Sequence, residues 1–542
     1  MGVLMTVRSG QHPSIGGWVA LTAGAAATMC AMSPSPAARP SNEPDAVEAS
    51  AHAIIPAPLS WVSLPGEQFE LTATSRVVVV SHDPAVAPVA ERFAEWLRPP
   101  TGYAVPVAGG EATDDDIVIS VAPSAEQGAE GYTLHVGSSG VRIGASTPAG
   151  VFRALTTLRQ LLPAAAEATA VQPGPWKIDG ADITDRPRFE YRGTMLDVAR
   201  HFFGVDDVLR HVDLISLYKV NVLHLHLTDD QGWRLTVPGW PLLTEVGGAG
   251  DIDGGPGGYF TAEDYARIVA YAAERFIEVV PEIDGPGHAS AALISYPELN
   301  CDGTAPPPFH HGGISEVTLC ASADSTYDFL GDVFDALAAE PGRYLHIGGD
   351  EAIGTPHDDF MEFVPRAAGL VVERGRTPVM WHEAAQANLP AGSVVQYWGV
   401  GQDEATELAR RAAAQGARLI LSPANHAYLD MQYDEDTPYG LEWAGHVPVS
   451  ASYAWEPATL IDGVTEASIL GVESALWSET TGDRGAVEHL AFPRLAGIAE
   501  IGWSPPSALM WEDYRLRVAA QGPRWDVLGV NYFRSPEVPW PA

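Results

Sequence analysis

The chain has 542 residues, which is too long for one ordinary domain and ample for a barrel of about 250 residues beside a smaller domain. A hydrophobic content of 46% with 15 tryptophans fits a globular protein with a large core. The formal net charge of −38 argues against a nucleic-acid binder and against a protein held on an anionic membrane, because both depend on positive charge. We therefore expect a protein that works among neutral or cationic ligands.

The N-terminus is typical of an export signal. Arg8 provides a positive flank, residues 18–32 are mostly apolar and small, and small residues and prolines follow. This apolar run is short for a helix that spans a membrane. We predict a signal peptide over residues 1–32 and a secreted, extracellular protein. A lipid anchor at Cys30 is the alternative, although Met29 before it is larger than the small residue that such a site usually has.

Two cysteines, Cys301 and Cys320, remain if Cys30 leaves with the signal. Export makes disulfides possible, and two cysteines allow one pairing. They bracket a loop over residues 302–319 that is rich in proline and glycine. We expect a disulfide that closes this loop, with two free buried thiols as the alternative.

A small first domain is expected after a linker. Residues 33–56 are rich in proline, alanine, serine and acidic residues without periodicity, which predicts a disordered linker. Residues 57–186 then alternate short strands and helices as a small α+β domain. They hold no cluster of histidine, aspartate and glutamate among apolar strands, so we expect a structural role. The elements are predicted at residues 76–81, 86–97, 117–121, 132–136, 141–145 and 148–162, with a hairpin between the last two strands.

The pattern changes after Pro187, where apolar strands alternate with longer helical or loop segments. This alternation is typical of a parallel sheet with crossover connections. Eight strands over residues 187–542 predict a (β/α)8 TIM barrel, so the fold class is α/β, a barrel preceded by a small α+β domain. The predicted strands are Tyr191–Asp197, Val220–Leu227, Ile277–Ile283, Tyr344–Gly348, Pro378–Trp381, Val394–Trp398, Arg418–Leu421 and Ile469–Trp477.

Chemistry in such barrels lies at the C-terminal ends of the strands. Most of the predicted ends carry a carboxylate, histidine, arginine or tryptophan. The fourth ends in two glycines and the adjacent pair Asp350-Glu351, which can serve one site if the backbone bends there. Aromatic rings stack on the apolar faces of sugars, and charged groups bond sugar hydroxyls. The strand ends therefore indicate a hydrolase with a polar substrate.

The stretch His346-Ile347-Gly348-Gly349-Asp350-Glu351 resembles the signature of family 20 of the glycoside hydrolases, the β-N-acetylhexosaminidases. The resemblance runs from about Pro187 to the C-terminus, and the first domain resembles the α+β domain that precedes the family's barrel. Further stretches agree in order: Arg192-Gly193 through Asp197 to Arg200-His201, His224-Leu225-His226 through Asp229-Asp230-Gln231, Pro281-Glu282-Ile283-Asp284 through Pro286-Gly287-His288, Trp381, Tyr397-Trp398, Tyr428-Leu429-Asp430 and Trp477-Ser478-Glu479.

The resemblance implies release of terminal non-reducing N-acetyl-D-hexosamine, either GlcNAc or GalNAc, from chitooligosaccharides or glycans. It implies a retaining mechanism in which the substrate's own acetamido group is the nucleophile, through an oxazolinium intermediate. No cofactor and no metal are expected. His382 stands where the family pattern has an acid, which leaves the role of its loop open.

By the same resemblance, Glu351 is the general acid and later the base. Asp350 orients the acetamido N–H, and Tyr428 donates to the acetamido oxygen. Asp229 and His288 form a relay behind the acid. Tryptophans box the acetamido methyl and the sugar face, charged groups hold the ring hydroxyls, and Trp443 stacks on the leaving group. The substrate-binding residues implied are Arg200, Trp381, Trp398, Asp430, Trp443, Trp477 and Glu479.

Three alternatives stay open. A disaccharide-releasing member of the family depends on pocket depth. A metal-dependent barrel amidohydrolase would use His224 and His226 with His288 and Asp350 as metal ligands. Such sites often bridge two metal ions with a lysine at a later strand end, and neither lysine of this chain, Lys177 or Lys219, is at one. The third is a non-catalytic sugar-binding protein. We expect a carbohydrate substrate, no nucleic acid, no membrane span, and a monomer or homodimer.

Overall fold

The computed structural model describes residues 52–401 and 404–541. The predicted signal peptide, Cys30 and most of the predicted linker lie outside the described residues. None of the described helices has the length and apolar character that crossing a bilayer requires.

The last residues of the predicted linker are folded, so its boundary at residue 56 was wrong. Ile54 and Ile55 are fully buried. The backbone of Ile55 donates to Gln160 Oε1 at 2.9 Å and accepts from Gln160 Nε2 at 2.6 Å. Ala57 N donates to Glu500 Oε2 at 2.8 Å. Two apolar side chains at the end of a polar stretch are therefore enough to anchor it against both domains.

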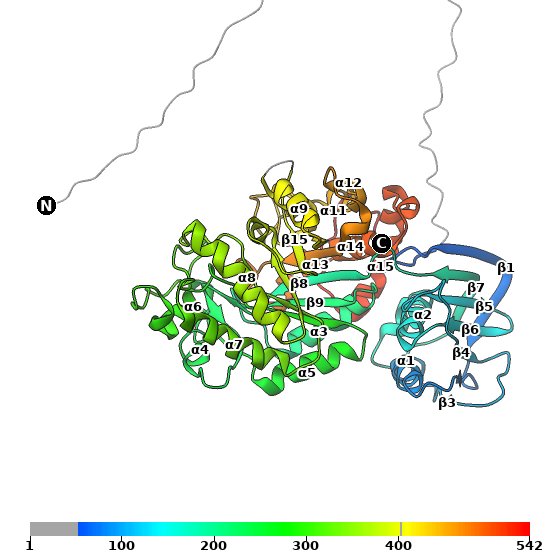
Figure 1. Ribbon diagram of the computed structural model, residues 1–542. Helices are drawn as coiled ribbons and strands as arrows, with labels where there is room; N and C mark the ends of the chain where they lie inside the picture. Colours follow the sequence, from blue (N-terminus) through cyan, green and yellow to red (C-terminus); the bar gives the residue numbers. More distant parts are fainter. Residues whose placement is uncertain (1–51, 402–403, 542) are drawn as a thin grey trace, which may run out of the picture. The chain divides into compact units, whose positions relative to one another are not determined.

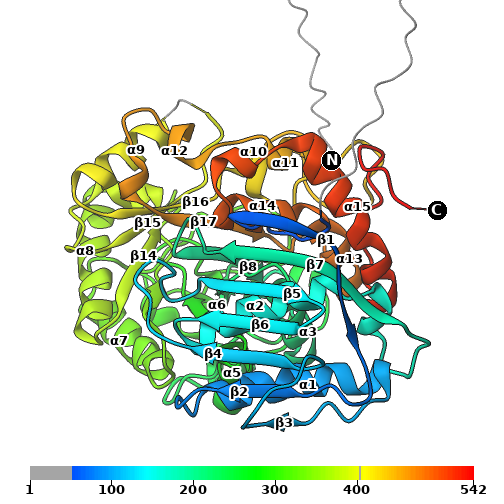
Figure 2. The same ribbon diagram turned by 90° about the vertical axis from the view of Figure 1, so that its right-hand side faces the viewer.

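The first domain is built on one seven-stranded sheet in the order β1-β7-β5-β6-β4-β2-β3, which Figure 2 shows with its strands side by side. The predicted hairpin is present as β5 and β6. β1 and β7 were not predicted, because β1 contains Pro65-Gly66 and its register with β7 shifts between Ser63 and Gln68. The strands are β1 (Ser60–Leu71), β2 (Val77–Val80), β3 (Val107–Ala108), β4 (Ile117–Val121), β5 (Tyr132–Gly137), β6 (Gly140–Ala145) and β7 (Trp176–Asp185).

Two helices, α1 (Val86–Thr101) and α2 (Pro148–Leu161), lie between this sheet and the barrel (Figure 1). α2 begins at Thr147, whose side chain accepts from Gly150 N. α1 continues through Pro99-Pro100 and ends at Gly102, which is left-handed. The expected stop before the prolines was therefore a few residues too early.

The second domain is a closed barrel of eight parallel strands in the order β8-β9-β12-β13-β14-β15-β16-β17, so the predicted fold class is confirmed. All eight predicted strands are present. The fourth ends at His346 rather than Gly348, because Gly348 and Gly349 are both left-handed and turn the chain. The strands are β8 (Tyr191–Asp197), β9 (Val222–His226), β12 (Glu278–Glu282), β13 (Tyr344–His346), β14 (Thr377–Trp381), β15 (Val394–Tyr397), β16 (Arg418–Leu421) and β17 (Ile469–Leu476).

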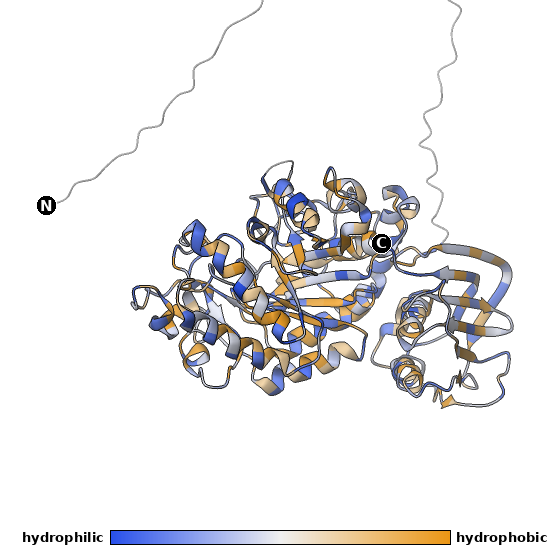
Figure 3. Cartoon of the chain, viewed as in Figure 1, coloured by the Kyte–Doolittle hydropathy of each residue, from blue (hydrophilic) through white to orange (hydrophobic). Residues whose placement is uncertain are grey.

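Helices surround the barrel (Figure 1), and they mix hydrophobic with hydrophilic residues (Figure 3), as expected for elements with one buried face. After β14 the connection is only a 3-10 helix, η4 (His382–Gln386). The α-helices are α3 (Val205–Ser216), α4 (Leu242–Glu245), α5 (Ala262–Ala273), α6 (Ser290–Ser295), α7 (Asp324–Ala338), α8 (His357–Glu373), α9 (Glu404–Ala414), α10 (Ala424–Ala427), α11 (Val449–Tyr453), α12 (Pro457–Leu460), α13 (Arg484–Ala491), α14 (Arg494–Trp503) and α15 (Trp511–Leu528). A short ribbon of β10 (Thr228–Asp229) and β11 (Gly232–Trp233) follows β9.

Candidate active site

A cavity of about 370 Å³ opens at the C-terminal ends of the barrel strands. Most of the side chains that the sequence predicts for the site lie in its wall, although they come from segments far apart in the chain. The predicted residues that line it are Arg200, His288, Asp350, Glu351, Trp398, Tyr428, Asp430, Trp443, Trp477 and Glu479.

The two adjacent carboxylates reach this cavity through a sharp turn after β13. Gly348 and Gly349 have φ of 67° and 99°, and Glu351 itself has φ of 45°. A Cβ at Gly348 would lie 1.6 Å from Asp284 Oδ1, so no other residue fits there. Asp284 Oδ1 also accepts from Gly349 N at 3.1 Å. A left-handed glutamate is a strained backbone position of the kind often held at functional sites.

His288 stands behind the carboxylate pair. Its Nε2 lies 3.6 Å from Glu351 Oε2 and 3.7 Å from Asp350 Oδ2, and its Nδ1 lies 3.1 Å from Asp229 Oδ1. Asp229 does not line the cavity but contacts two residues that do, His288 and Arg200. The other oxygen of Asp229 is 2.9 Å from Arg200 Nη2. The five side chains therefore form one connected ionic group.

The charges of this group follow from burial and pairing. Burial and the neighbouring Glu351 raise the pKa of Asp350 to about 6, against the opposing effect of His288. Burial also opposes ionisation of Asp229, but Arg200 and His288 hold the pKa of Asp229 far below its usual range. Although burial lowers it, the carboxylates of Asp229 and Asp350 raise the pKa of His288 well above its ordinary value. The site thus holds a charged histidine beside an Asp that titrates near neutrality.

Aromatic rings form one side of the cavity. The Tyr428 ring centroid lies 5.9 Å from that of Trp443 and 6.1 Å from that of Trp477. The rings of Trp398 and Trp443 are 5.9 Å apart and nearly perpendicular. Trp443 is 53% exposed, so its indole stands at the cavity mouth with a face open to solvent. Such a wall suits the apolar faces of a sugar.

Two carboxylates of the lining lack partners for one oxygen each. Asp430 Oδ2 and Glu479 Oε2 are buried and make no hydrogen bond with the described residues. Burial and the mutual repulsion of the pair raise the pKa of Asp430 well above its usual range, and burial raises the pKa of Glu479. The Arg200 guanidinium lies nearby, 4.8 Å from the Trp477 ring centroid. Buried polar atoms without partners are costly, so these atoms are suited to ligand hydroxyls.

Trp381 is one layer deeper than the other tryptophans. It is fully buried and does not line the cavity. Its indole N–H donates to Glu282 Oε1 at 2.8 Å, and its ring centroid lies 5.9 Å from that of Trp477. Trp381 therefore supports the wall in this structure, and its contact with a ligand stays a prediction.

The lining also contains Gly313, Ile314 and Leu441, which sequence reasoning missed. Gly313 and Ile314 belong to the loop that Cys301 and Cys320 bracket, and these cysteines form a disulfide as predicted. Ser315 N donates to Asp230 Oδ2 at 3.0 Å, which ties the loop to the barrel. The bracketing cysteines were the one signal that this loop has a defined conformation.

A second cavity, of about 280 Å³, lies between α1, α2 and α3. Its wall is apolar and aromatic with several arginines, but each guanidinium already pairs with a carboxylate. These pairs are Arg92 with Glu274, Arg159 with Glu167, Arg210 with Glu488, and Arg275 with Asp213. It offers no converging acid and base, unlike the cavity at the strand ends.

Histidines and carboxylates in the described part of the chain form four groups close enough to hold a metal ion. The residues expected for a metal-dependent amidohydrolase are split among these groups. His224 joins Glu282 and His346, His226 joins Glu282 and Asp284, and His288 joins Asp350 and Glu351 in a third. The structure thus does not assemble the four predicted metal ligands into one site.

Comparison with known families agrees with this geometry. The model described as "Glycosyl hydrolase family 20, catalytic domain" matches residues 189–360 and 354–506, and "Glycosyl hydrolase family 20, domain 2" matches residues 51–186. The chain belongs to glycosyl hydrolase family 20. The two matched models together cover both folded domains.

Named relatives extend along most of the chain. A protein of Cellulomonas fimi named "Beta-N-acetylhexosaminidase" is 41% identical over 492 residues, which are 90% of this chain and 97% of that protein. The solved β-N-acetylhexosaminidase of Streptomyces coelicolor is 48% identical with a TM-score of 0.88, covering 90% of this chain and 99% of that one. A mutant β-hexosaminidase of Streptomyces plicatus, solved with its product GlcNAc, is 48% identical with a TM-score of 0.87, covering 90% and 98%.

Proposed function

We propose that this family 20 member is a β-N-acetylhexosaminidase that releases terminal non-reducing N-acetyl-D-hexosamine from chitooligosaccharides or glycans. One observation carries the proposal: Asp350, Glu351 and Tyr428 face a single cavity with aromatic walls and unpaired carboxylate oxygens. The names of the relatives, and the GlcNAc bound to one of them, support the same activity.

In the proposed first step, the carbonyl oxygen of the substrate's acetamido group attacks the anomeric carbon. The bond to the leaving oxygen breaks as Glu351 gives that oxygen a proton, and an oxazolinium ring with its sugar is left. Asp350 accepts a hydrogen bond from the acetamido N–H and balances the positive charge that develops there. Tyr428 donates a hydrogen bond to the acetamido oxygen and holds it for attack.

In the second step, Glu351 takes a proton from water, which attacks the anomeric carbon on the face that the leaving group left. The bond between this carbon and the acetamido oxygen breaks, so the acetamido group is restored with retained configuration. His288, held by Asp229, faces the Glu351 carboxylate and stabilises its ionised form between the two steps. Arg200, Asp430 and Glu479 are proposed to bind ring hydroxyls.

The activity is tested by comparing rates on an aryl N-acetylglucosaminide, an aryl N-acetylgalactosaminide and chitobiose. A thiazoline analogue of the oxazolinium ring should inhibit all three reactions. Turnover that a thiazoline does not affect would contradict the neighbouring-group mechanism. Release of a disaccharide from a longer glycan, without release of GlcNAc, would favour the disaccharide-releasing alternative.

We also infer an exported protein that acts as a monomer or homodimer. The signal-like composition of residues 1–32 supports export. Fractionation of expressing cells tests the location, and a shift of the mature protein in mass spectrometry would reveal a lipid on Cys30. Light scattering of the purified protein tests the oligomeric state.

A further inference from the structure

The interior of the barrel changes character along its axis. Its lower layer is apolar and includes Val222, Val280 and Ile420. The layer above is ionic and fully buried, and it contains His224, His226, Glu282, His346 and Glu473. Barrel interiors are usually filled with branched apolar side chains. Buried ion pairs are often no more stabilising than apolar packing of the same volume. Such a layer directly beneath an active site therefore calls for a role other than stability.

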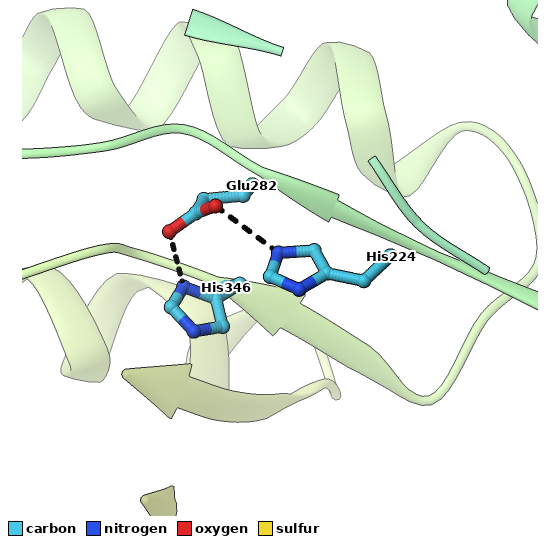
Figure 4. Close-up of side chains that lie close together, drawn as sticks. All are labelled: His224, Glu282 and His346. Atoms are coloured by element: carbon cyan, nitrogen blue, oxygen red, sulfur yellow. Dashed lines mark ion pairs between the residues drawn. The ribbon is translucent and has the colours of Figure 1, made fainter. Parts of the chain in front are cut away.

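Glu282, at the end of β12, is the centre of this layer. Its Oε1 accepts from Trp381 Nε1 at 2.8 Å and lies 2.9 Å from His346 Nδ1. Its Oε2 lies 3.1 Å from His224 Nε2 and contacts His226 Nδ1. Figure 4 shows His224 and His346 approaching the carboxylate of Glu282, and their strands, β9 and β13, lie on either side of β12. Four ring nitrogens thus surround one carboxylate, and His346 Nδ1 also accepts from Gly348 N at 3.0 Å.

His226 connects this centre to the catalytic site. Its Nδ1 faces Glu282, and its Nε2 lies 2.6 Å from Asp229 Oδ2. The other oxygen of Asp229 bonds His288, which faces Glu351. Hydrogen bonds join Glu282, His226, Asp229 and His288 in sequence, and His288 Nε2 faces Glu351 Oε2 at 3.6 Å. We name these five alternating acids and bases the buried relay. It runs from the barrel core to the cavity.

The groups around His226 favour its charged form. Carboxylates face it from three segments: Glu282 on β12, Asp284 just after that strand, and Asp229 on β10. His224 on its own strand, Arg200 bound to Asp229, and Asp350 after β13 are the further charged neighbours, and the Trp477 ring covers one side at 4.9 Å. Although burial opposes it, Glu282 and Asp229 raise the pKa of His226 well above its ordinary value.

We propose that Glu282 and His226 are positioning residues of the proton relay, which keep a positive charge against Asp229 and so hold His288 toward the general acid Glu351. The inference rests on the proposed hexosaminidase activity and deepens it. A charged His226 makes a stronger hydrogen bond to Asp229 than a neutral one. The orientation of Asp229, and through it that of His288, thus depends on a carboxylate that never touches the substrate.

The variant Glu282→Gln keeps the shape of residue 282 and removes its charge. His226 should then lose its proton at a lower pH than in wild type, because one of the two carboxylates that raise its pKa has become neutral. The rate on chitobiose, relative to wild type, should match wild type at low pH and fall about tenfold as the pH rises. On a dinitrophenyl N-acetylglucosaminide, the ratio of the variant's rate to the wild-type rate should stay close to one at every pH, because this leaving group needs no proton. A merely structural role would lower both rates equally, without pH dependence.

Glu473→Gln is the matched control. Glu473 is equally buried in the same layer and bonds His224 Nδ1 at 2.9 Å, but it does not contact His226. Its variant should show a rate ratio that does not change with pH or with leaving group. Glu282→Asp, which restores the charge, should recover at least part of the chitobiose rate above pH 7.

The outcomes distinguish failure of the positioning role of Glu282 and His226 from failure of the proposed hexosaminidase activity. If Glu282→Gln lacks the wild-type unfolding transition, His226→Gln replaces it and should lower the chitobiose rate alone at all pH values. If the wild type is active but the ratio of variant to wild-type rate is the same at every pH and on both substrates, for Glu282→Gln and for His226→Gln, the inference is overturned. Wild type that cleaves neither substrate overturns the proposed function instead. Loss of wild-type activity on dialysis against a chelator, restored by zinc, would also overturn the inference, since the His–Glu cluster would then hold a metal.

Discussion

Glu351 lies where a strained turn brings a carboxylate to the cavity mouth, with about a third of its side chain exposed and His288 on one side. This position suits a proton donor that must reach both the glycosidic oxygen and, later, water. Glu351→Gln should lower kcat on chitobiose by about a hundredfold or more, because general acid catalysis is worth about 10² to 10⁴. A dinitrophenyl glycoside should lose far less rate. Equal losses on the two substrates, measured by steady-state kinetics, would contradict the acid assignment.

Asp350 gives the reaction its expected dependence on acid pH. Burial raises the pKa of this carboxyl to about 6, and the proposed role requires the ionised form. With this raised pKa, the Asp350 carboxylate is fully ionised well above pH 6 and becomes protonated as the pH falls through that value. At pH 5 about a tenth of the molecules would be ionised, so kcat/KM on an activated substrate should be about tenfold lower than at pH 7. A pH profile of kcat/KM measures this limb.

The variant Asp350→Asn tests the assignment of that limb. It should lower kcat on activated substrates as well as on chitobiose, because an amide cannot balance the charge of the oxazolinium ring. The acid limb near pH 6 should also disappear from its profile. An unchanged limb in Asp350→Asn would assign the ionisation to another group, and unchanged rates on activated substrates would contradict the role of Asp350.

Among the elements, the barrel strands were predictable because each is an apolar run with polar residues at its end. Parallel strands place those ends together, which is why residues as distant as Arg200 and Glu479 could be assigned to one site. The sequence could not show that Trp381 is buried below the cavity wall, because the residues at the end of a strand lie at different distances from the cavity. Ile314 and Leu441 lie on loops whose paths depend on tertiary contacts such as Ser315 with Asp230. His224 and His226 were recognisable as polar residues of a barrel strand, but their pairing with Glu282 and Glu473 on other strands was not, because it depends on the closed barrel.

The disulfide loop is the element whose contribution to the site can be tested separately. It carries Gly313 and Ile314 to the cavity wall, and Cys301–Cys320 closes it. Replacing both cysteines with serine should lower the free energy of unfolding by about 3 kcal/mol on the chain-entropy model. KM for chitobiose should rise, because the wall at Ile314 is less well held, while a thiazoline analogue should still inhibit the enzyme.

Calorimetry with and without dithiothreitol on the wild-type protein measures the same effect without a substitution. The serine variant itself is the control, since reductant should not change its unfolding temperature. Equal stability and equal KM for the oxidised and reduced enzyme would show that the loop is held by Asp230 and packing alone.

At the scale of the whole molecule, a hydrophobic core and a buried ion pair both include residues of the two domains. Trp503 on α14 of the barrel domain packs in the hydrophobic core of the first domain. Its indole N–H donates to Asp185 Oδ1 at 2.9 Å. Asp185 Oδ2 lies 2.8 Å from Lys219 Nζ, and both of these side chains are fully buried. Tyr132 OH lies 3.0 Å from the same ammonium group. The first domain is thus bound to the barrel by a buried ion pair.

Lys219→Met should therefore lower the free energy of unfolding by about 3–5 kcal/mol, because it leaves the Asp185 carboxylate buried beside an apolar chain. The other lysine of the chain is a matched control. Lys177 lies 3.6 Å from Glu70 with both side chains well exposed, so Lys177→Met should change stability little. The double variant Lys219→Met/Asp185→Asn should be more stable than Lys219→Met alone, since the unpaired charge is removed. Urea unfolding of the four proteins measures these differences. Equal stability of the two single variants would contradict the view that this ion pair joins the domains.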